Sequence, residues 1–216
     1  MTTDGWGAQL TTRVAEQIRR HRKAAGLTVA ETADACTARG LPVPKTTITN
    51  LETGRRSSVD LAEFLVLADV FGVPPITLLF PLDTAPTVDV LPGQPVSTWN
   101  GLAWFTGETA STEAAPKGSP RELLDLFRAH GDAVAAARAS TSLAKERRRM
   151  ANTTLDPARR TELLDAATGY EQFAFDDCRA LGAFRDSMRE RGLVPPELPA
   201  DLAFVDQSKA STKDTE

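Results

Sequence analysis

The chain has 216 residues, a formal net charge of −4 at pH 7, and a composition that is 41% hydrophobic and 6% aromatic. This length predicts one domain with a smaller second one. No apolar run approaches the ~18 residues of a membrane helix, and no basic segment followed by an apolar one marks a secretory signal. The two cysteines are far apart, which argues against a disulfide framework or a metal site, so we expect a cytoplasmic protein without a cofactor.

The N-terminal part of the chain predicts one helix. Residues 1–10 are expected to be loosely attached, with Trp6 as the exception. Apolar side chains recur at three-to-four spacing over residues 12–25, which indicates a helix, and Gly26 ends it. The opposite face of this helix is rich in Arg and Lys, and this fits either a solvated surface or contact with phosphate groups.

Residues 27–56 predict two short helices joined by a long turn. Thr28 can cap the first helix, because its hydroxyl can accept a hydrogen bond from an otherwise unpaired amide. The second helix is predicted over residues 45–53, with Ile48 and Leu51 on one inward face. Its other faces carry short hydrogen-bonding side chains and no exposed acid.

Positive charge is concentrated around these helices. Residues 11–56 hold nine Lys or Arg against four Asp or Glu, although the whole chain is acidic. A protein that binds DNA through one face needs such a local patch rather than a basic composition.

The next elements close a small core and lead into a connector. Helices are predicted over residues 57–71, capped by Ser57 or Ser58, and over 75–80. Residues 83–119 are rich in Pro, Thr, Ser and Gly, with alternating valines that favour a β-containing segment and a short helix over residues 99–105. This short helix carries an aromatic cluster that fits packing against a domain, a dimer contact or a ligand-facing surface.

The C-terminal region predicts a helical hairpin. A helix over residues 120–150, with a possible break at Gly131, is followed by a turn and a second helix that reaches about residue 191. Two helices have little core of their own, so we expect a third surface from a second copy, the aromatic cluster or the N-terminal domain. The fold class is therefore all-α, and the predicted domains are residues 1–82, 83–119 and 120–205, followed by a disordered tail, 206–216.

The second short helix carries a motif that resembles a known family. Thr47, Ile48, Thr49, Glu52 and Gly54 match the pattern Ser/Thr-Ile-Ser-x-x-Glu-x-Gly of lambda-repressor-like helix-turn-helix regulators, also called the xenobiotic-response-element type. The resemblance covers roughly residues 12–81 and implies a five-helix DNA-binding domain. Two features depart from the family pattern, namely Val29 in the place of a common Gln, and a longer turn over residues 37–44.

The resemblance implies which residues contact double-stranded DNA. The base contacts are expected from Lys45, Thr46, Thr47, Thr49 and Asn50, and the phosphate contacts from Thr28, Arg22, Arg55 and Arg56. Basic residues at the tip of the C-terminal hairpin fit either a solvated tip or a second contact with DNA or a protein partner. These residues are Arg147, Arg148, Arg149, Arg159 and Arg160.

The sequence thus predicts a sequence-specific DNA-binding transcriptional regulator, expected to be a repressor, and not an enzyme. No phosphate-binding loop, nucleophile elbow or metal-ligand spacing is present. A homodimer through the C-terminal helices is one expectation, and no motif specifies a small-molecule effector. The alternative is a protein-interaction module of the antitoxin or anti-activator type, and a sensor built on Trp99, Trp104 and Phe105 is a third hypothesis.

Overall fold

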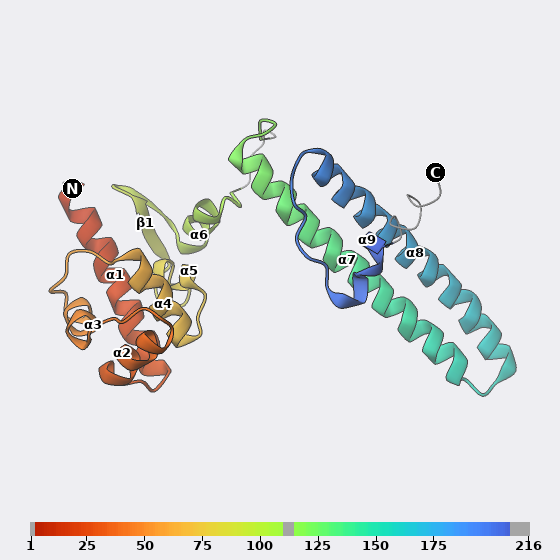
Figure 1. Ribbon diagram of the computed structural model, residues 1–216, viewed down its shortest axis with the longest axis horizontal. Coiled ribbons are helices and arrows are strands. Elements are labelled where there is room, and N and C mark those ends of the chain that lie inside the picture. The colour runs from red at the N-terminus through yellow and green to blue at the C-terminus, as the bar shows by residue number, and fades with distance from the viewer. Residues whose placement is uncertain (1–2, 110–114, 208–216) are drawn as a thin grey trace. The chain divides into compact units, whose positions relative to one another are not determined.

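The computed structural model describes residues 3–109 and 115–207, and the chain divides into two compact units between residues 111 and 112 (Figure 1). The predicted all-α fold is confirmed, with a five-helix domain, a connector that contains a small sheet, and a helical hairpin. The first unit contains α1 Thr3–Ala24, α2 Val29–Ala38, α3 Lys45–Glu52, α4 Leu61–Phe71, α5 Pro75–Leu79, β1 Thr87–Leu91, β2 Gln94–Ser97 and α6 Thr98–Thr106. The second contains α7 Pro120–Thr153, α8 Pro157–Glu190, a 3-10 helix Ala200–Leu202, and α9 Phe204–Gln207.

All five N-terminal helices contribute to one core. Each of them places at least one side chain in the interior with no more than 1% of its surface exposed. Burial of apolar side chains at this three-to-four spacing is what holds such short helices, which are marginal in isolation. These core residues are Ile18, Cys36, Ile48, Leu67 and Leu78.

Helix α1 begins much earlier than the sequence predicts. It starts at Thr3, so the expectation of a loosely attached segment over residues 1–10 is wrong for residues 3–10. Two contacts explain the longer helix, because Leu10 packs against the core and the Trp6 indole donates a hydrogen bond to the Asp89 carbonyl at 3.2 Å. The start of α1 is therefore held by the connector.

The start of α4 also differs from the prediction. The helix begins at Leu61 rather than at residue 57, and its cap is Asp60 rather than a serine. The Asp60 carboxylate accepts hydrogen bonds from two amides, those of Ala62 at 2.8 Å and Glu63 at 3.1 Å. A carboxylate at this position also suits the positive end of the helix dipole.

The connector packs on the five-helix domain rather than forming a separate body. Strands β1 and β2 pair in antiparallel fashion, and α6 follows with Ser97 as its cap. The ring centroids of Phe80 and Phe105 lie 5.6 Å apart, and this contact joins α6 to the end of α5. Gly101 permits this packing, because a Cβ there would lie only 2.9 Å from Val90 Cγ1.

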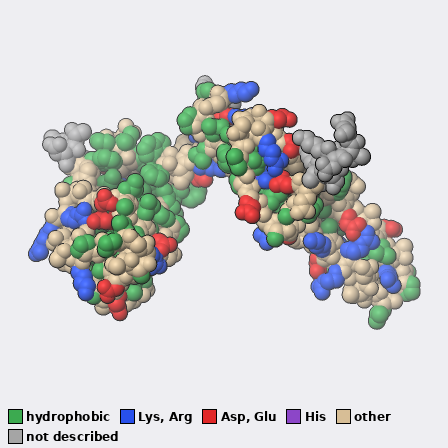
Figure 2. All heavy atoms as spheres, in the orientation of Figure 1, with side chains coloured by type: hydrophobic (Ala, Val, Ile, Leu, Met, Phe, Trp, Pro, Cys, Tyr) green, Lys and Arg blue, Asp and Glu red, His purple; other side chains and the backbone are tan. Residues whose placement is uncertain are grey.

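The aromatic cluster of the connector is largely exposed. Trp99, Trp104 and Phe105 are 61%, 49% and 56% exposed, although Phe105 touches Phe80. Figure 2 shows hydrophobic side chains gathered on the surface of the first unit near β1 and α6.

Helices α7 and α8 form the predicted antiparallel hairpin, and Gly131 does not break α7. Small side chains line their contact, which allows the two backbones to approach closely. The buried alanines are Ala137, Ala144 and Ala151 of α7 and Ala167 and Ala174 of α8.

The chain's own C-terminal segment supplies the third surface over part of this hairpin. The sequence led us to expect this surface from a second copy, the aromatic cluster or the N-terminal domain, and that expectation is wrong for the covered part. Leu198, Leu202 and Val205 are no more than 9% exposed and pack with Ala137 and Leu181. The predicted disordered tail is corrected at its first two residues, which belong to α9, and residues 208–216 lie outside the described part.

A nearly buried guanidinium fastens this segment. Arg185 is 3% exposed and donates to both carboxylate oxygens of Asp206, at 2.9 and 2.7 Å, and to the Pro196 carbonyl at 2.7 Å. Its Nη1 also lies 2.8 Å from His130 Nε2, and because a guanidinium can only donate, this imidazole nitrogen accepts. One side chain therefore joins α7, α8 and the C-terminal segment.

None of the helices within residues 3–109 and 115–207 has the length and apolar character needed to cross a lipid bilayer.

Candidate nucleic-acid interface

Helix α2 starts with the cap that the sequence predicts. The Thr28 hydroxyl accepts a hydrogen bond from the Glu31 amide at 3.2 Å, and the Glu31 carboxylate accepts one from the Thr28 amide at 2.8 Å. This reciprocal capping box fixes the entry into α2. It also lowers the pKa of Glu31, because the Thr28 backbone and hydroxyl bond to the charged carboxylate.

The connection between α2 and α3 is shorter than predicted. Helix α2 continues to Ala38, so the turn comprises residues 39–44 rather than 37–44. Val43 is 2% exposed and anchors the turn in the core. The turn is therefore attached to the core, and it holds α3 at a fixed position.

Helix α3 divides into a buried face and an exposed face. Ile48 and Leu51 are 0% and 1% exposed, and they press the helix onto the core. Lys45, Thr46 and Thr49 are exposed, while Thr47 and Asn50 are half-buried. All five predicted base-contacting residues thus lie on α3, and four of them are uncharged.

The front of α3 is electropositive. Its N-cap residue is Pro44, which makes no side-chain cap, and the first turn contains no acid. The uncapped amides and the helix dipole give this end partial positive charge, to which Lys45 adds a full charge. Within the described residues, no ion pair engages Lys45, so its ammonium is available to an anion.

The C-terminal end of α3 is clamped by an ion pair that the sequence did not reveal. Arg22 donates to both oxygens of Glu52, from Nε at 2.6 Å and from Nη2 at 2.7 Å, and its Nη1 donates to the Leu27 carbonyl at 2.7 Å. The hydrogen bonds to Glu52 raise the pKa of Arg22. Each guanidinium nitrogen of Arg22 is thus bonded inside the domain, and its expected phosphate contact stays a prediction.

The other predicted phosphate-contacting residues differ in availability. Gly54, with φ of 70°, allows the chain to turn at the end of α3, and Arg55 follows it as an exposed side chain without an ion pair among the described residues. Arg56 Nη1 donates to Glu63 at 2.6 Å, which reduces its freedom. The Thr28 hydroxyl is used by its capping box.

Most of the basic face of α1 is occupied within the first unit. Arg20 pairs with Asp83, and this contact lowers the pKa of Asp83 to about 2. Arg13 Nε is buried and has no hydrogen-bond partner among the described residues, and burial lowers the pKa of Arg13 while Asp89 opposes the shift. Arg20 and Arg13 thus face the connector, whereas Arg19 and Lys23 of the same helix are exposed.

The basic residues at the hairpin tip are not one cluster. Arg147 lies over the Tyr170 ring, 5.3 Å from its centroid. Arg148 pairs with Glu171 and Arg149 with Glu146, so Lys and Arg alternate with Asp and Glu over the second unit, as Figure 2 shows. Arg159 and Arg160 remain exposed, and neither has an ion pair among the residues that the structure describes.

Two structural features were not predicted from the sequence, for different reasons. The Arg22–Glu52 pair joins residues 30 positions apart and has no local signal. Arg185 does have one, because it lies four residues after Leu181 and three before Met188 on the buried stripe of α8. A charged residue on a buried stripe predicts a partner elsewhere in the chain.

Comparisons with known proteins agree with this geometry over the first unit. No curated protein and no solved structure matches the chain. Residues 13–79 match the family model described as a helix-turn-helix domain. The chain therefore contains a helix-turn-helix domain, which supports a DNA-binding regulator with DNA as its partner.

Proposed function

We propose that this protein is a sequence-specific DNA-binding repressor of the lambda-repressor-like type, which reads the major groove with α3. The observation that carries the proposal is the exposed face of α3. It presents Lys45, Thr46 and Thr49 with the half-buried Asn50, its first turn contains no acid, and Arg55, which has no ion pair among the described residues, follows it. This combination of neutral hydrogen-bonding groups and cations suits the edges of base pairs flanked by phosphates.

Each side chain has a chemical partner in this arrangement. The side-chain amide of Asn50 has no hydrogen-bond partner among the described residues, and such an amide can form two hydrogen bonds with the edge of an adenine. Lys45 can reach the acceptors of guanine, and a threonine methyl can contact the thymine methyl. Arg55 is placed just after the helix, where a guanidinium suits a backbone phosphate.

Selection of bound sequences from a random DNA pool tests the proposal. We expect a defined site to be enriched, and the same site upstream of a reporter gene should reduce transcription when the protein is present. Recovery of sequences with no common site would contradict specific reading by α3. Enhanced transcription would contradict repression but leave the DNA-binding role intact.

The symmetry of the selected site also tests the proposed homodimer. A palindromic site matches a two-fold protein, so it would indicate a dimer, whereas an asymmetric site would indicate a monomer. Sedimentation at micromolar concentration with and without the selected DNA measures the stoichiometry directly.

A further inference from the structure

One face of the α7–α8 hairpin runs along both helices, and the C-terminal segment covers only part of it. On α7 this face contains His130, Ala137, Thr141, Ala144 and Arg148, which follow at helical spacing. The C-terminal segment packs over its first half, where Ala137 and Leu181 of α8 are completely buried. The second half continues toward the turn that joins the two helices.

The covered half shows which chemistry this face accepts. The C-terminal segment packs Leu198, Leu202 and Val205 against Ala137 of α7 and Leu181 of α8. It also presents carboxylates to the surrounding guanidinium groups. These pairs are Asp201 with Arg138 at 3.0 Å, and Asp206 with Arg185 and Arg189, both at 2.7 Å. The covering segment is therefore apolar on one side and acidic at its edges.

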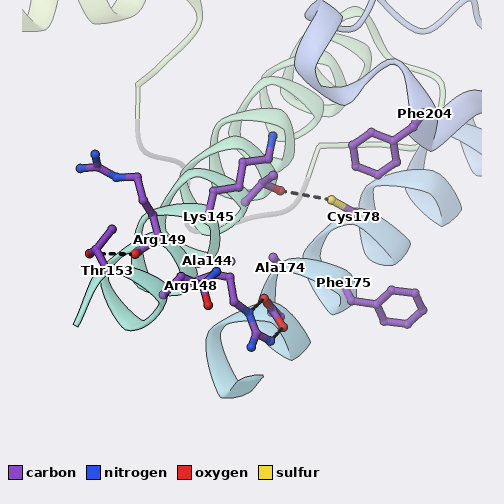
Figure 3. A pocket seen from close by; sticks show the side chains of 12 residues that line it. Ala144, Lys145, Arg148, Arg149, Thr153, Ala174, Phe175, Cys178 and Phe204 are labelled. Atoms are coloured by element: carbon purple, nitrogen blue, oxygen red, sulfur yellow. Dashed lines mark hydrogen bonds and ion pairs between the residues drawn. The ribbon is translucent and has the colours of Figure 1, made fainter. Parts of the chain in front are cut away.

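The uncovered half has the same chemistry without a cover. It is an open groove of about 590 Å³. The floor contains Ala144 and Ala174, and Phe175 and Phe204 supply large apolar surfaces although they are 62% and 49% exposed. Figure 3 shows Phe204, from α9, beside Cys178 at the end of the groove that adjoins the covered half.

Cations outnumber carboxylates in the groove. Lys145, Arg148 and Arg149 line it together with a single carboxylate, Glu171, which pairs with Arg148. Arg149 also bonds to Glu146 outside the groove, but the Arg149 side chain is 74% exposed, and such surface pairs contribute little. Lys145 has no ion pair among the described residues, so the α7 edge of the groove is positive.

Neither the following residues nor a second copy suits this groove. The nine residues after Gln207 read SKASTKDTE and contain alanine as their only apolar residue, so they lack side chains to cover the phenylalanines. Two copies placed groove to groove would bring the same cations together, which is unfavourable.

We propose that this groove binds an acidic amphipathic helix of a partner protein, in continuation of the C-terminal segment. The α7 edge spans residues 141–153, which is ~18 Å at 1.5 Å per residue and fits a helix of about three turns. The partner's apolar side chains lie on Ala144 and Ala174 and against Phe175, and its carboxylates meet Lys145 and Arg149. This mode of recognition is a helix in a groove, and it does not depend on DNA binding by the first unit.

A labelled synthetic peptide tests the proposal with the full chain. The probe is a 14-residue helix-forming peptide with leucines along one face and Asp or Glu at its edges, and binding is followed by fluorescence anisotropy. We expect binding with a Kd in the micromolar range that weakens as salt is added. A scrambled peptide of the same composition, and an analogue with Lys in place of the acids, should bind at least tenfold more weakly.

Two matched pairs of variants locate the binding surface. Phe175→Ser should weaken peptide binding at least tenfold, whereas Phe173→Ser, at a side chain that is 68% exposed on the same helix but outside the groove, should leave it unchanged. Lys145→Glu should weaken binding about tenfold, and Arg159→Glu, also exposed but outside the groove, should not. Circular dichroism confirms that each variant remains folded.

Four results would overturn the proposal. The first is absence of binding at 100 micromolar peptide, and the second is equal binding of the acidic and scrambled peptides. The third is a dimer in sedimentation that Phe175→Ser disrupts while no peptide binds, because the groove would then be occupied by a second copy. Equal effects of Phe173→Ser and Phe175→Ser would place the peptide elsewhere and count against the groove.

Discussion

Arg22 and Glu52 meet through two hydrogen bonds, of 2.6 and 2.7 Å, and their side chains are only 11% and 8% exposed. Arg22 also bonds to the Leu27 carbonyl just before α2. The pair therefore ties the end of α3 to α1 and to the start of the helix-turn-helix. A residue of the motif, Glu52, in this way holds the proposed reading helix against α1.

Removing one partner of this pair should destabilise the domain. In Glu52→Ala the guanidinium is left buried without its carboxylate, and we expect a loss of about 3 kcal/mol in the free energy of unfolding, measured by urea denaturation. Arg19→Ala is the control, because Arg19 is exposed and should change stability by less than about 0.5 kcal/mol. A double variant with Arg22→Met and Glu52→Leu should recover most of the loss. Equal stability of Glu52→Ala and Arg19→Ala would show that the pair contributes nothing.

Asn50→Ala should relax sequence preference without unfolding the protein. The side-chain amide of Asn50 makes no hydrogen bond within the described residues, so its removal leaves no unpaired partner in the free protein. We expect affinity for the selected site to fall by about 1–3 kcal/mol, with the preference lost at one base pair. Titration of the selected site and its single-base variants measures both effects. Unchanged affinity and preference would show that α3 is not positioned as proposed.

Arg55→Ala should weaken binding to all DNA sequences alike. A phosphate contact carries no base information, so the ratio of specific to non-specific affinity should stay the same. The slope of log affinity against log salt should become shallower by about 0.9, the value for one neutralised phosphate in B-DNA. Arg39→Ala serves as a comparison, because Arg39 pairs with Asp69 on the domain surface. A change in preferred sequence would indicate that Arg55 reads a base instead.

Two glycine-to-alanine substitutions should have opposite effects. Alanine is favoured over glycine inside a helix by about 0.5–1 kcal/mol. At Gly131 the new Cβ meets no atom within 4 Å, so this gain should appear as added stability. At Gly101 the Cβ would lie 2.9–3.1 Å from side-chain atoms of Val90, Phe80 and Val88, and such overpacking costs about 1–3 kcal/mol. Thermal unfolding of the two variants measures the difference, and stabilisation by Gly101→Ala would contradict the packing of α6.

The second unit should lose stability as the pH falls through the range of histidine. Burial, and then the positive charge of Arg185, lower the pKa of His130 in the folded protein, while Asp206 opposes the shift. The unfolded chain takes up a proton near pH 6.5, whereas the folded chain resists it, so stability is present above pH 6.5 and is lost as the pH falls toward the lowered pKa. Melting curves of the full chain between pH 7.5 and pH 5 test this.

His130→Gln is the control for that measurement. An amide can accept from Arg185 but does not titrate, so the decline between pH 7 and pH 5 should become shallower. The pKa of Asp206 is also lowered, chiefly by its hydrogen bonds with Arg185. Its contribution is lost only as the pH falls below about 4, so the two effects occupy separate ranges. An identical decline in the wild type and His130→Gln would exclude His130 as the cause.

The sequence predicted the features that depend on neighbouring residues. Thr28 caps α2, and Ile48 and Leu51 face the core, because capping and helical spacing act over three or four positions. The cap of α4 was predicted wrongly. Ser57, Ser58 and Asp60 are all residue types that cap helices well, and the structure uses Asp60.

The features that the sequence did not predict depend on distant partners. Residues 3–10 are helical in a structure in which Trp6 bonds to Asp89, which is 83 positions away. Leu198 and Leu202 return to α7 and α8 from a segment that is rich in proline and shows no strong period. In the site, the five residues predicted to contact bases lie on α3, and their contacts with DNA stay predictions. The internal bonds of Arg22 and Arg56 join residues that are distant in the sequence, so they follow only from folding.

The division into two units has a spectroscopic consequence. All three tryptophans, Trp6, Trp99 and Trp104, belong to the first unit, and the single tyrosine, Tyr170, belongs to the second. Selective excitation of tryptophan therefore follows the helix-turn-helix unit alone, in the unmodified protein. Unfolding of that unit, or its binding to DNA, can be observed separately from changes in the hairpin. A measurement of total helicity, by contrast, reports on both units together.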